Sequence, residues 1–462
     1  MKYISTRGEA PVLDFEGAML TGLARDGGLY VPDHVPVFSV TELKALRGEP
    51  FTEVAFAVAS RFADGSIPDA DLRRMIGEAY GTFSHAAVTP LKQLASNHFL
   101  LELFHGPTIA FKDVAMQLLA RLMDWSLARR GERACIVGAT SGDTGGAAIE
   151  AFRNSTRASI FMLHPHGRVS DVQRRQMTTV AAPHVHNIAI EGTFDDCQAI
   201  VKDLFNDLAF RDEVRLAGVN SINWARVMAQ ITYYLYAGLA LGAPDRAVSF
   251  TVPTGNFGNV FAGLMAKRMG LPIEKLVIAT NANDILDRTL KSGRYEVKGV
   301  VPTTSPSMDI QVSSNFERLV YLANTGDPAA VRAAMASLKQ SGSFSLSSDA
   351  LLAIRQEFAS GAADNNAAAA MIRLILEETG ELLDPHTAVG VAVARQNLGA
   401  SPMLTLATAH PAKFPDAVEQ ASGIRPLLPS RLKHLLDAPE SFTLLPGSAE
   451  AVKSHVQERY KR

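Results

Sequence analysis

The sequence predicts an α/β fold built on parallel sheets, and three observations support this. Short apolar runs such as ACIVGAT at 134–140 and ASIFMLHP at 158–165 have the length of buried strands. Stretches with helical periodicity follow them, so strands and helices alternate along the chain. Strands that are apolar on both faces are typical of parallel sheets covered by helices. Because ligands in such sheets bind beyond the carboxyl ends of the strands, we expect the chemistry in the turns that follow them.

The expected elements can be placed in order along the chain. The region up to about residue 95 is predicted to be mostly helical, with helices in FEGAMLTGL, TELKALRG, FTEVAFAVASRF and DADLRRMIGEAYGTF. The predicted strands beyond it are ACIVGAT, ASIFMLHP, HNIAIEG, AVSFTVPT, KLVIATN and PMLTLATAH. The predicted helices between them are GGAAIEAFRN, VSDVQRRQMTTV, FDDCQAIVKDLFND and NVFAGLMAKRMG. The stretch GAADNNAAAA from Gly361 is expected to be a loop that runs into an Ala-rich helix.

Length and composition exclude several classes of protein. With 462 residues and about 150 residues per domain, we expect two or three domains. A formal net charge of -2 gives no basic surface for nucleic acid or anionic lipid. Cys135 and Cys197 lack metal-ligand spacing, which argues against a zinc site or disulfide framework and fits a reducing compartment. Without a secretion signal or an apolar run of about 20 residues, the chain is predicted to be soluble and cytoplasmic.

Lys112 is unusual because it begins a helix that is apolar nearly all round. Met116, Leu119 and Met123 share its face, and a helix of this kind is expected to be buried. Burial and the helix N-terminal dipole both favour the neutral amine, which is the form that makes a Schiff base. The alternative is a structural lysine that reaches solvent, or one that pairs with Asp113 or Glu102.

Two strand-to-helix turns are candidate anion sites. The first, ATSGDTGG after the strand at 134–140, combines small residues with a helix N-terminus. The second, PTGNFGN from Pro253, has the same character, and Asn259 is expected to cap the helix behind it. The second turn matches neither a Walker A loop nor a GxGxxG fingerprint, which disfavours an NTPase or a nicotinamide enzyme. An activated lysine together with anion-binding loops on a parallel sheet points to pyridoxal phosphate, an aldehyde that carries a phosphate.

The chain resembles the threonine synthase family of fold-type II pyridoxal-phosphate enzymes, in particular its longer bacterial and fungal branch. The motifs LELFHGPTIAFKD, ATSGDTGGAA, NSINWARVMAQ, PTGNFGN and TAHPAKF occur in that order. The resemblance implies a tryptophan synthase β-like fold, with two open α/β domains and a small N-terminal region. It divides the chain into the N-terminal region 1–95, a lysine and substrate-binding region 96–240, and a cofactor-phosphate domain with a C-terminal tail, 241–462.

The resemblance also implies a role for individual residues. Lys112 matches the Schiff-base lysine, Thr408 the hydroxyl that faces the pyridine nitrogen, and Asp143 lies beside the 3′-oxygen of the cofactor. The loop for the cofactor phosphate consists of Gly255, Asn256, Phe257, Gly258 and Asn259. The residues for the substrate are Ser141 and Thr144, for its carboxylate, and Ser221 and Arg226, for its phosphate. For His105 and His410 two roles stay possible: lining the site, or a structural role. No metal is implied.

The implied reaction converts O-phospho-L-homoserine and water to L-threonine and phosphate. Lys112, displaced by the substrate amine, would act as the base at Cα and shuttle protons to and from Cα and Cβ. Phosphate would then leave from Cγ, and water would add at Cβ. Alternatives are another fold-type II lyase such as a threonine or serine dehydratase, which needs no Ser221 and Arg226 site, and a regulatory protein that binds phosphate ligands without catalysis. The implied assembly is a monomer or homodimer.

Overall fold

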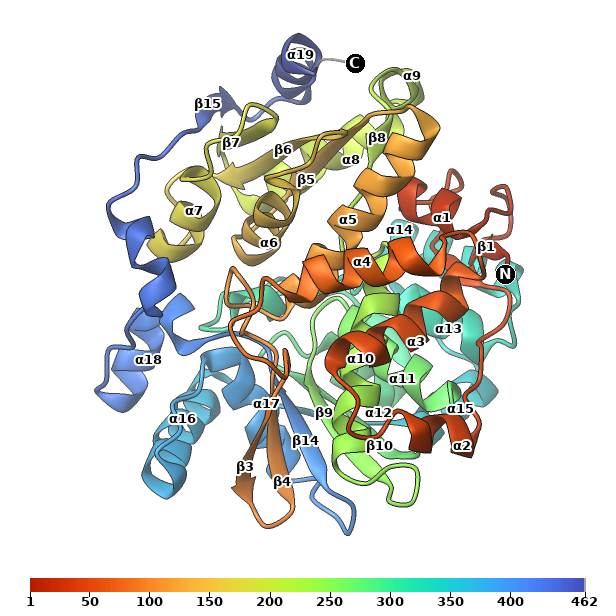
Figure 1. The fold of residues 1–462 in the computed structure, drawn as a ribbon, viewed down its shortest axis with the longest axis vertical. Coiled ribbons are helices and arrows are strands. Elements are labelled where there is room, and N and C mark those ends of the chain that lie inside the picture. The colour runs from red at the N-terminus through yellow and green to blue at the C-terminus, as the bar shows by residue number, and fades with distance from the viewer. Residues whose placement is uncertain (461–462) are drawn as a thin grey trace.

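The computed structural model describes residues 1–460 and contains two large sheets, which lie in the lower and upper parts of the molecule in Figure 1. The lower sheet has six strands in the order β13-β10-β9-β14-β4-β3. All of its pairings are parallel except β3 with β4, which is antiparallel. Its strands are β3 (Leu91–Ala95), β4 (His98–Glu102), β9 (Val248–Pro253), β10 (Ile273–Thr280), β13 (Phe358–Ala362) and β14 (Met403–Ala407).

The upper sheet has five strands in the order β15-β7-β6-β5-β8, and every pairing in it is parallel. Its strands are β5 (Ala134–Ala139), β6 (Ala158–Pro165), β7 (Val185–Glu191), β8 (Leu216–Ala217) and β15 (Thr443–Pro446). Two small antiparallel ribbons complete the sheets, with β1 (Tyr3–Ser5) on β2 (Tyr30–Pro32) and β11 (Arg294–Glu296) on β12 (Ser343–Ser345). Strands β5 and β6 are almost wholly buried, as their apolar sequences predict.

Two long buried helices, α5 (Lys112–Arg130) and α10 (Trp224–Ala240), pack against each other between the sheets and the N-terminal helices. The N-terminal helices are α1 (Phe15–Thr21), α2 (Val40–Ala45), α3 (Phe51–Ala63) and α4 (Asp69–Tyr80). Helix α3 packs on α10, and α4 packs on α5. The N-terminal region is therefore part of the wall behind the helix that begins at Lys112.

The remaining helices cover the two sheets. Around the upper sheet they are α6 (Asp143–Phe152), α7 (Asp171–Thr178), α8 (Phe194–Asn206), α9 (Leu208–Glu213) and α19 (Ala449–Arg459). Around the lower sheet they are α11 (Gly258–Arg268), α12 (Ile285–Ser292), α13 (Phe316–Ala323), α14 (Pro328–Ser341), α15 (Ser348–Glu357), α16 (Asn365–Thr379), α17 (Pro385–Arg395) and α18 (Pro415–Ser422). Three 3₁₀ turns are η1 (Pro306–Met308), η2 (Pro411–Lys413) and η3 (Ser430–Leu436). Within residues 1–460, no helix is both long enough and apolar enough to cross a membrane.

The α/β class with parallel sheets is confirmed, and each of the six predicted strands is present. Two expectations about local structure are wrong. Gly361 lies in strand β13 and not in a loop, because it pairs with Ala279 of β10. Asn259 does not cap α11, because the helix begins one residue earlier, at Gly258.

The predicted regions 1–95, 96–240 and 241–462 stay a prediction, and the sheets group some strands across them. Strand β4, from the second range, lies in the lower sheet beside β14. Strand β15, from the C-terminal tail, completes the upper sheet beside β7, and both lie near α19 at the top of Figure 1. Residues 461 and 462 of the third range lie outside the described residues.

Candidate active site

Backbone hydrogen bonds place Lys112 at the carboxyl end of the lower sheet. Strands β4 and β14 are parallel neighbours, so the segments that follow them leave the same edge. The amide of Phe111 donates to the carbonyl oxygen of Thr408 at 2.8 Å, and the amide of His410 donates to that of Ile109 at 3.1 Å. Ile109 adopts a φ of 53°, which is a strained conformation for a β-branched residue. This strained turn directs the chain into α5 with Lys112 as its first residue.

The Lys112 amine is buried and forms an ion pair with Asp143. The distance between Nζ and Oδ2 is 3.2 Å, and the lysine side chain is only 9% exposed. Burial lowers the pKa of Lys112, and the positive charges of Lys413 and Arg226 lower it further, while Asp143 opposes them. The structural alternatives do not apply, because Asp113 accepts hydrogen bonds from Thr108 and the lysine does not reach solvent. The structure thus holds an amine whose pKa is below that of an ordinary lysine, because burial outweighs the neighbouring carboxylate.

Asp143, the first residue of α6, is contacted by four side chains, three of which donate hydrogen bonds, while Lys413 forms an ion pair. Besides Lys112, they are Lys413 at 2.9 Å, Gln173 at 2.8 Å and Ser307 at 3.1 Å. Burial raises the pKa of this carboxyl, but the two lysines outweigh it and hold the pKa well below its ordinary value. Asp143 is therefore ionised, and both of its carboxylate oxygens have polar partners.

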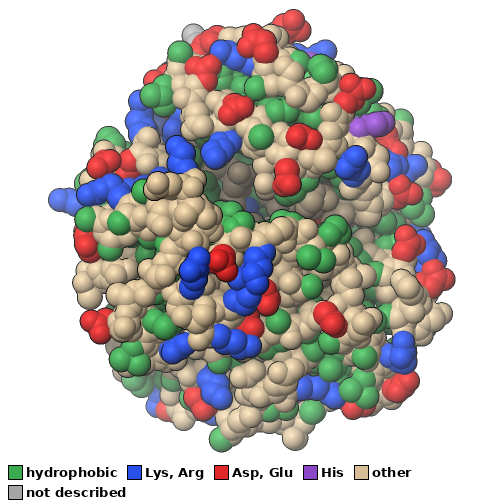
Figure 2. Space-filling model, turned by 180° about the vertical axis from the view of Figure 1, so that it is seen from behind, with side chains coloured by type: hydrophobic (Ala, Val, Ile, Leu, Met, Phe, Trp, Pro, Cys, Tyr) green, Lys and Arg blue, Asp and Glu red, His purple; other side chains and the backbone are tan. Residues whose placement is uncertain are grey.

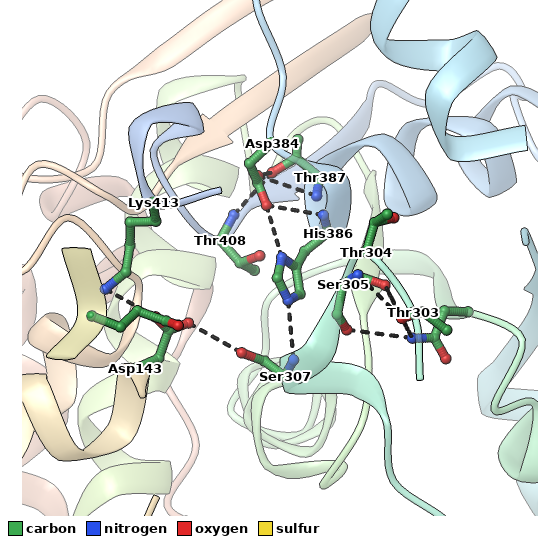
Figure 3. A network of polar contacts seen from close by, with 12 residues as sticks. Asp143, Thr303, Thr304, Ser305, Ser307, Asp384, His386, Thr387, Thr408 and Lys413 are labelled. Atoms are coloured by element: carbon green, nitrogen blue, oxygen red, sulfur yellow. Dashed lines mark hydrogen bonds and ion pairs between the residues drawn. The ribbon is translucent and has the colours of Figure 1, made fainter. Parts of the chain in front are cut away.

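The contact between Asp143 and Ser307 joins the two sheets. Asp143 follows β5 of the upper sheet, whereas Ser307 lies in η1, on the side of the lower sheet (Figure 3). The back of the molecule is hollowed where the upper and lower parts meet (Figure 2). The amide of Ser307 in turn donates to Nε2 of His386 at 3.2 Å, and Nδ1 of that ring contacts Asp384 at 2.9 Å. This assigns His386 the tautomer with its hydrogen on Nδ1.

A further group of polar side chains, of which Figure 3 labels Thr303, supports the segment around Ser307. Asp309 accepts hydrogen bonds from Asn281 at 2.8 Å, from Asn283 at 3.0 Å, and from the hydroxyl and amide of Thr303 at 2.6 and 2.9 Å. Because these partners lie beyond the end of β10, they fix the loop against the lower sheet. The position of Ser307 beside Asp143 is therefore held by side chains that contact neither lysine.

The loop after β9 forms a narrow cradle at the N-terminus of α11. Phe257 precedes the helix with a φ of 64°, a strained left-handed conformation for an aromatic residue. A Cβ on Gly255 would lie 2.9 Å from Ile310 Cδ1 and 3.0 Å from the carbonyl oxygen of Ser307, so only glycine fits there. The carbonyl of Asn256, between them, accepts the amide of Asn315 at 3.1 Å. Gly258 begins the helix, whose free amide hydrogens suit an anion.

Asn259 has a different role from the predicted cap. Its Oδ1 accepts from the hydroxyls of Tyr233 at 2.5 Å and Tyr234 at 2.9 Å, both on α10. Its Nδ2 is buried and has no hydrogen-bond partner among residues 1–460. A buried amide that lacks an acceptor is costly, so this donor fits a site that is completed by a ligand.

Arg226 is a buried cation near the lysine. It lies in the first turn of α10, is 2% exposed, and donates through Nη1 to the carbonyl oxygen of Val219 at 3.1 Å. In the described part of the chain its Nε has no partner. Burial lowers its pKa to about 10, so it stays charged at neutral pH. Ser221 is partly buried in the turn before α10, and Asn315 donates to its carbonyl oxygen at 3.2 Å.

Ser141 and Thr144 flank the start of α6 and are both partly buried. The turn itself is held by Thr140, whose Oγ1 accepts the amides of Gly142 and Gly145, each at 2.9 Å. The two predicted carboxylate-binding residues thus stand on either side of Asp143, at a helix N-terminus. This position suits a substrate carboxylate.

Thr408 is buried at the end of β14, and its amide donates to Thr387 Oγ1 at 3.3 Å. The two histidines nearby make structural contacts. His105 contacts Glu102 at 2.7 Å, and His410 accepts the amide of Ala412 at 3.1 Å to cap η2. Burial lowers the pKa of His410 to about 4, which leaves this ring neutral at physiological pH.

Several residues of the site were missed from the sequence: Lys413, Gln173, Ser307, Asp384 and His386. Lys413 stands in the quoted motif TAHPAKF, so its position in that motif was an available signal. Gln173 lies in α7, and Ser307 lies in a turn between loops. They follow no strand of the predicted sheets directly, so a search of strand-to-helix turns could not find them.

Comparisons with known proteins agree with this geometry. Family models described as "Threonine synthase N terminus", "Pyridoxal-phosphate dependent enzyme" and "Threonine synthase, C-terminal" match residues 2–80, 83–338 and 387–456. A threonine synthase of Pseudomonas aeruginosa is 52% identical over 100% of this chain and 99% of its own length. The crystal structure of pyridoxal-phosphate-bound threonine synthase from Brucella melitensis is 61% identical, with 100% of both chains covered and a TM-score of 0.97. The yeast threonine synthase structure is 42% identical, with 99% of this chain and 98% of its own covered and a TM-score of 0.92.

Proposed function

The chain belongs to the threonine synthase family of pyridoxal-phosphate-dependent enzymes, and from this premise we propose that it converts O-phospho-L-homoserine and water to L-threonine and phosphate. The observation that carries the proposal is the pairing of a buried Lys112 amine with a second buried cation, Arg226, that has an unpartnered donor. The first suits covalent attachment of the cofactor, and the second suits a substrate that carries its own phosphate. A cytoplasmic location is part of the proposal, supported by two buried cysteines that are both unpaired.

The residues present fit pyridoxal phosphate. Lys112 supplies the amine for its aldehyde, and the loop from Gly255 to Asn259 supplies backbone amides at a helix N-terminus for its phosphate. The unpartnered Nδ2 of Asn259 is a further donor for an anion. Thr408 would face the pyridine nitrogen with a neutral hydroxyl, and Asp143 would lie beside the 3′-oxygen. When held in this way, the cofactor supplies an electron sink for bonds that break at the Cα and Cβ atoms of the substrate.

The protein groups divide the remaining work. Ser141 and Thr144 bind the substrate carboxylate at the N-terminus of α6, and Ser221 and Arg226 bind its phosphate. Arginine suits this second role because its planar fork binds phosphate through two hydrogen bonds. Fixing the substrate at both ends orients its Cα hydrogen toward Lys112.

Lys112 holds and moves the protons. Its lowered pKa favours the neutral amine, which can accept a proton from Cα and then one from Cβ; after phosphate leaves, Cγ gains a proton, and Cα regains one at the end of the reaction. Asp143 stays ionised beside it and accepts the hydrogen bond of the protonated amine. Lys112, Asp143 and Arg226 are buried, so bulk water is kept away from the reacting atoms. Only a water molecule bound in the site would then add at Cβ.

The threonine or serine dehydratase alternative is not favoured, because the family models for both ends of threonine synthase match this chain. Phosphate release from O-phospho-L-homoserine, measured at steady state, tests the proposal. Lys112→Ala should abolish it, while Lys291→Ala, on the exposed side of α12, should leave it unchanged. The proposal fails if the purified protein carrying pyridoxal phosphate releases no phosphate but deaminates L-threonine, which would support the dehydratase. Protein that cannot be loaded with the cofactor would support the regulatory alternative.

A further inference from the structure

Two buried lysines from different parts of the chain hold opposite oxygens of Asp143. Lys112 Nζ lies 3.2 Å from Oδ2, and Lys413 Nζ lies 2.9 Å from Oδ1. Lys413 belongs to η2, beyond the last strand of the lower sheet, and is 0% exposed. Together, one carboxylate and two ammonium groups carry a net charge of +1. One lysine is therefore needed to balance the carboxylate, and the other is in excess.

The hydrogen bonds show which lysine is which. Lys413 has three polar partners: it forms an ion pair with Asp143 at 2.9 Å and donates to the carbonyl oxygen of Thr108 at 2.9 Å and to Oε1 of Gln176 at 3.0 Å. Two of the three N–H donors of its ammonium therefore have hydrogen-bond acceptors, and the carboxylate lies beside it as counter-ion (Figure 3 shows the pair with Asp143). Lys112 donates to Asp143 alone within the described residues, and its charge also faces the ring of Phe111 at 4.8 Å. These contacts favour the ammonium form of Lys413. Lys112 has one hydrogen bond to lose on deprotonation, so losing its proton costs less free energy.

The other charged and titratable groups around the pair agree with this assignment. Asp113 lies close enough for Lys413 to lower its pKa, yet burial dominates and raises that pKa to about 6. Arg226 adds positive charge on the side of Lys112, and His386 faces Asp143. Gln173 and Ser307 give Asp143 neutral donors. No other carboxylate contacts either ammonium among residues 1–460, so Asp143 depends on these two lysines for its charge balance.

We propose that Lys413 is the permanent counter-ion of Asp143, and that it positions this carboxylate for the chemistry of Lys112. The inference rests on the proposed function, in which the Lys112 nitrogen changes its proton and its bonding during each turnover. Whenever that nitrogen is neutral or bonded elsewhere, Lys413 keeps Asp143 ionised and in place. Its positive charge also repels a proton on Lys112, which keeps the amine nucleophilic. Lys413 touches no reacting atom, so it acts through Asp143 and Lys112.

Labelling of Lys112 in the cofactor-free protein tests this directly. The protein is treated with formaldehyde and cyanoborohydride over a range of pH, and methylation of Lys112 is followed by peptide mass spectrometry. Lys413→Met removes the positive neighbour, so the pH midpoint for labelling should rise by about one unit, equivalent to about tenfold slower labelling below the midpoint. Lys413→Arg should keep most of the wild-type midpoint. Lys453→Met, which removes a surface ion pair with Asp207, should not move it.

Folding is controlled by a second comparison. If Lys413→Met is too unstable to study, Lys413→Gln replaces it, because its neutral amide removes the charge and keeps a hydrogen-bond donor for the Thr108 carbonyl oxygen and Gln176. A Lys112 midpoint that is unchanged in folded Lys413→Met overturns the proposal and leaves Lys413 a support for Thr108 and Gln176 only. Failure of the proposed function looks different, because wild-type protein carrying pyridoxal phosphate would then release no phosphate from O-phospho-L-homoserine, whatever its labelling midpoint.

Discussion

The backbone amide of Phe111 donates to the carbonyl oxygen of Thr408 at 2.8 Å. Through this single contact the start of α5 is fixed to the end of β14, so the lysine and the hydroxyl predicted to hold opposite parts of the cofactor ring have a common reference point. The parallel pairing of β4 with β14 makes the contact possible, because both chains leave the sheet at the same edge.

Replacing Arg226 should separate substrate binding from catalysis. Arg226→Ala is expected to raise the KM for O-phospho-L-homoserine about ten- to hundredfold, since charge-assisted hydrogen bonds contribute about 1.5–3 kcal/mol. The bound cofactor should keep its absorbance, because Arg226 is not assigned to it. Steady-state kinetics with Arg226→Lys as the conservative comparison measures the effect, and an unchanged KM would count against the phosphate site.

A methyl group on Gly255 should weaken cofactor binding. The Cβ of Gly255→Ala would approach Ile310 and Ser307 to 2.9 and 3.0 Å, and relieving such overpacking costs about 1–3 kcal/mol. We expect the dissociation constant for pyridoxal phosphate to rise about tenfold or more by absorbance titration. Gly299→Ala is the matched control, because its Cβ would meet no atom within 4 Å. Equal affinities of the two variants for pyridoxal phosphate would show that the loop accommodates the added methyl group without strain.

Replacing His386 should free the amide of Ser307. That amide donates to His386 Nε2, and a hydrogen bond of this kind contributes about 1 kcal/mol. In His386→Ala, amide exchange in a peptide covering 303–309 should therefore be roughly five- to tenfold faster at Ser307. Hydrogen-exchange mass spectrometry measures it, with the exposed His34→Ala as the control. Unaltered exchange would mean that Asp309 alone holds the segment.

Acid should destabilise the fold partly through His98. Burial lowers the pKa of His98 to about 4 in the native protein, whereas the unfolded chain titrates near 6.5. The unfolded state therefore takes up the proton first, and the contribution is present above pH 6.5 and lost as the pH falls toward 4. The loss is on the order of 3 kcal/mol. Urea unfolding of His98→Asn should show a correspondingly flatter dependence on pH over this range, and an identical dependence would contradict the assignment.

The sequence was most informative where the chemistry depends on local pattern. The apolar faces of 112–130 predict a buried helix, which the structure confirms, and they single out its lysine because burying an ammonium is costly; the cofactor role of Lys112 stays a prediction. The partner of that lysine was not predictable in the same way. Asp113 is adjacent in sequence, but it turns to Thr108, and the ion pair forms with Asp143 on the other sheet.

Residues that arrive from distant segments were beyond such patterns. Ser307 and His386 lie on neither of the two predicted strand-to-helix turns, and their proximity to Asp143 depends on how the two sheets meet. Strand β3 was missed because LKQLA is mostly exposed at the sheet edge, and it lacks the apolar run of a buried strand. The site residues that were named came largely from ordered motifs, which carry three-dimensional information that periodicity does not.

The pairing of β15 with β7 and of β14 with β4 has a consequence for how the protein is made. Each sheet needs a strand from the last sixty residues of the chain, Met403–Ala407 in one case and Thr443–Pro446 in the other. During translation neither sheet can be completed until these late strands have left the ribosome. The contacts of the Lys112 helix with Thr408 and of Asp143 with Lys413 therefore form last. Nascent chains stalled before residue 403 would lack Thr408 and Lys413, so the cofactor would bind only to chains that extend beyond these residues.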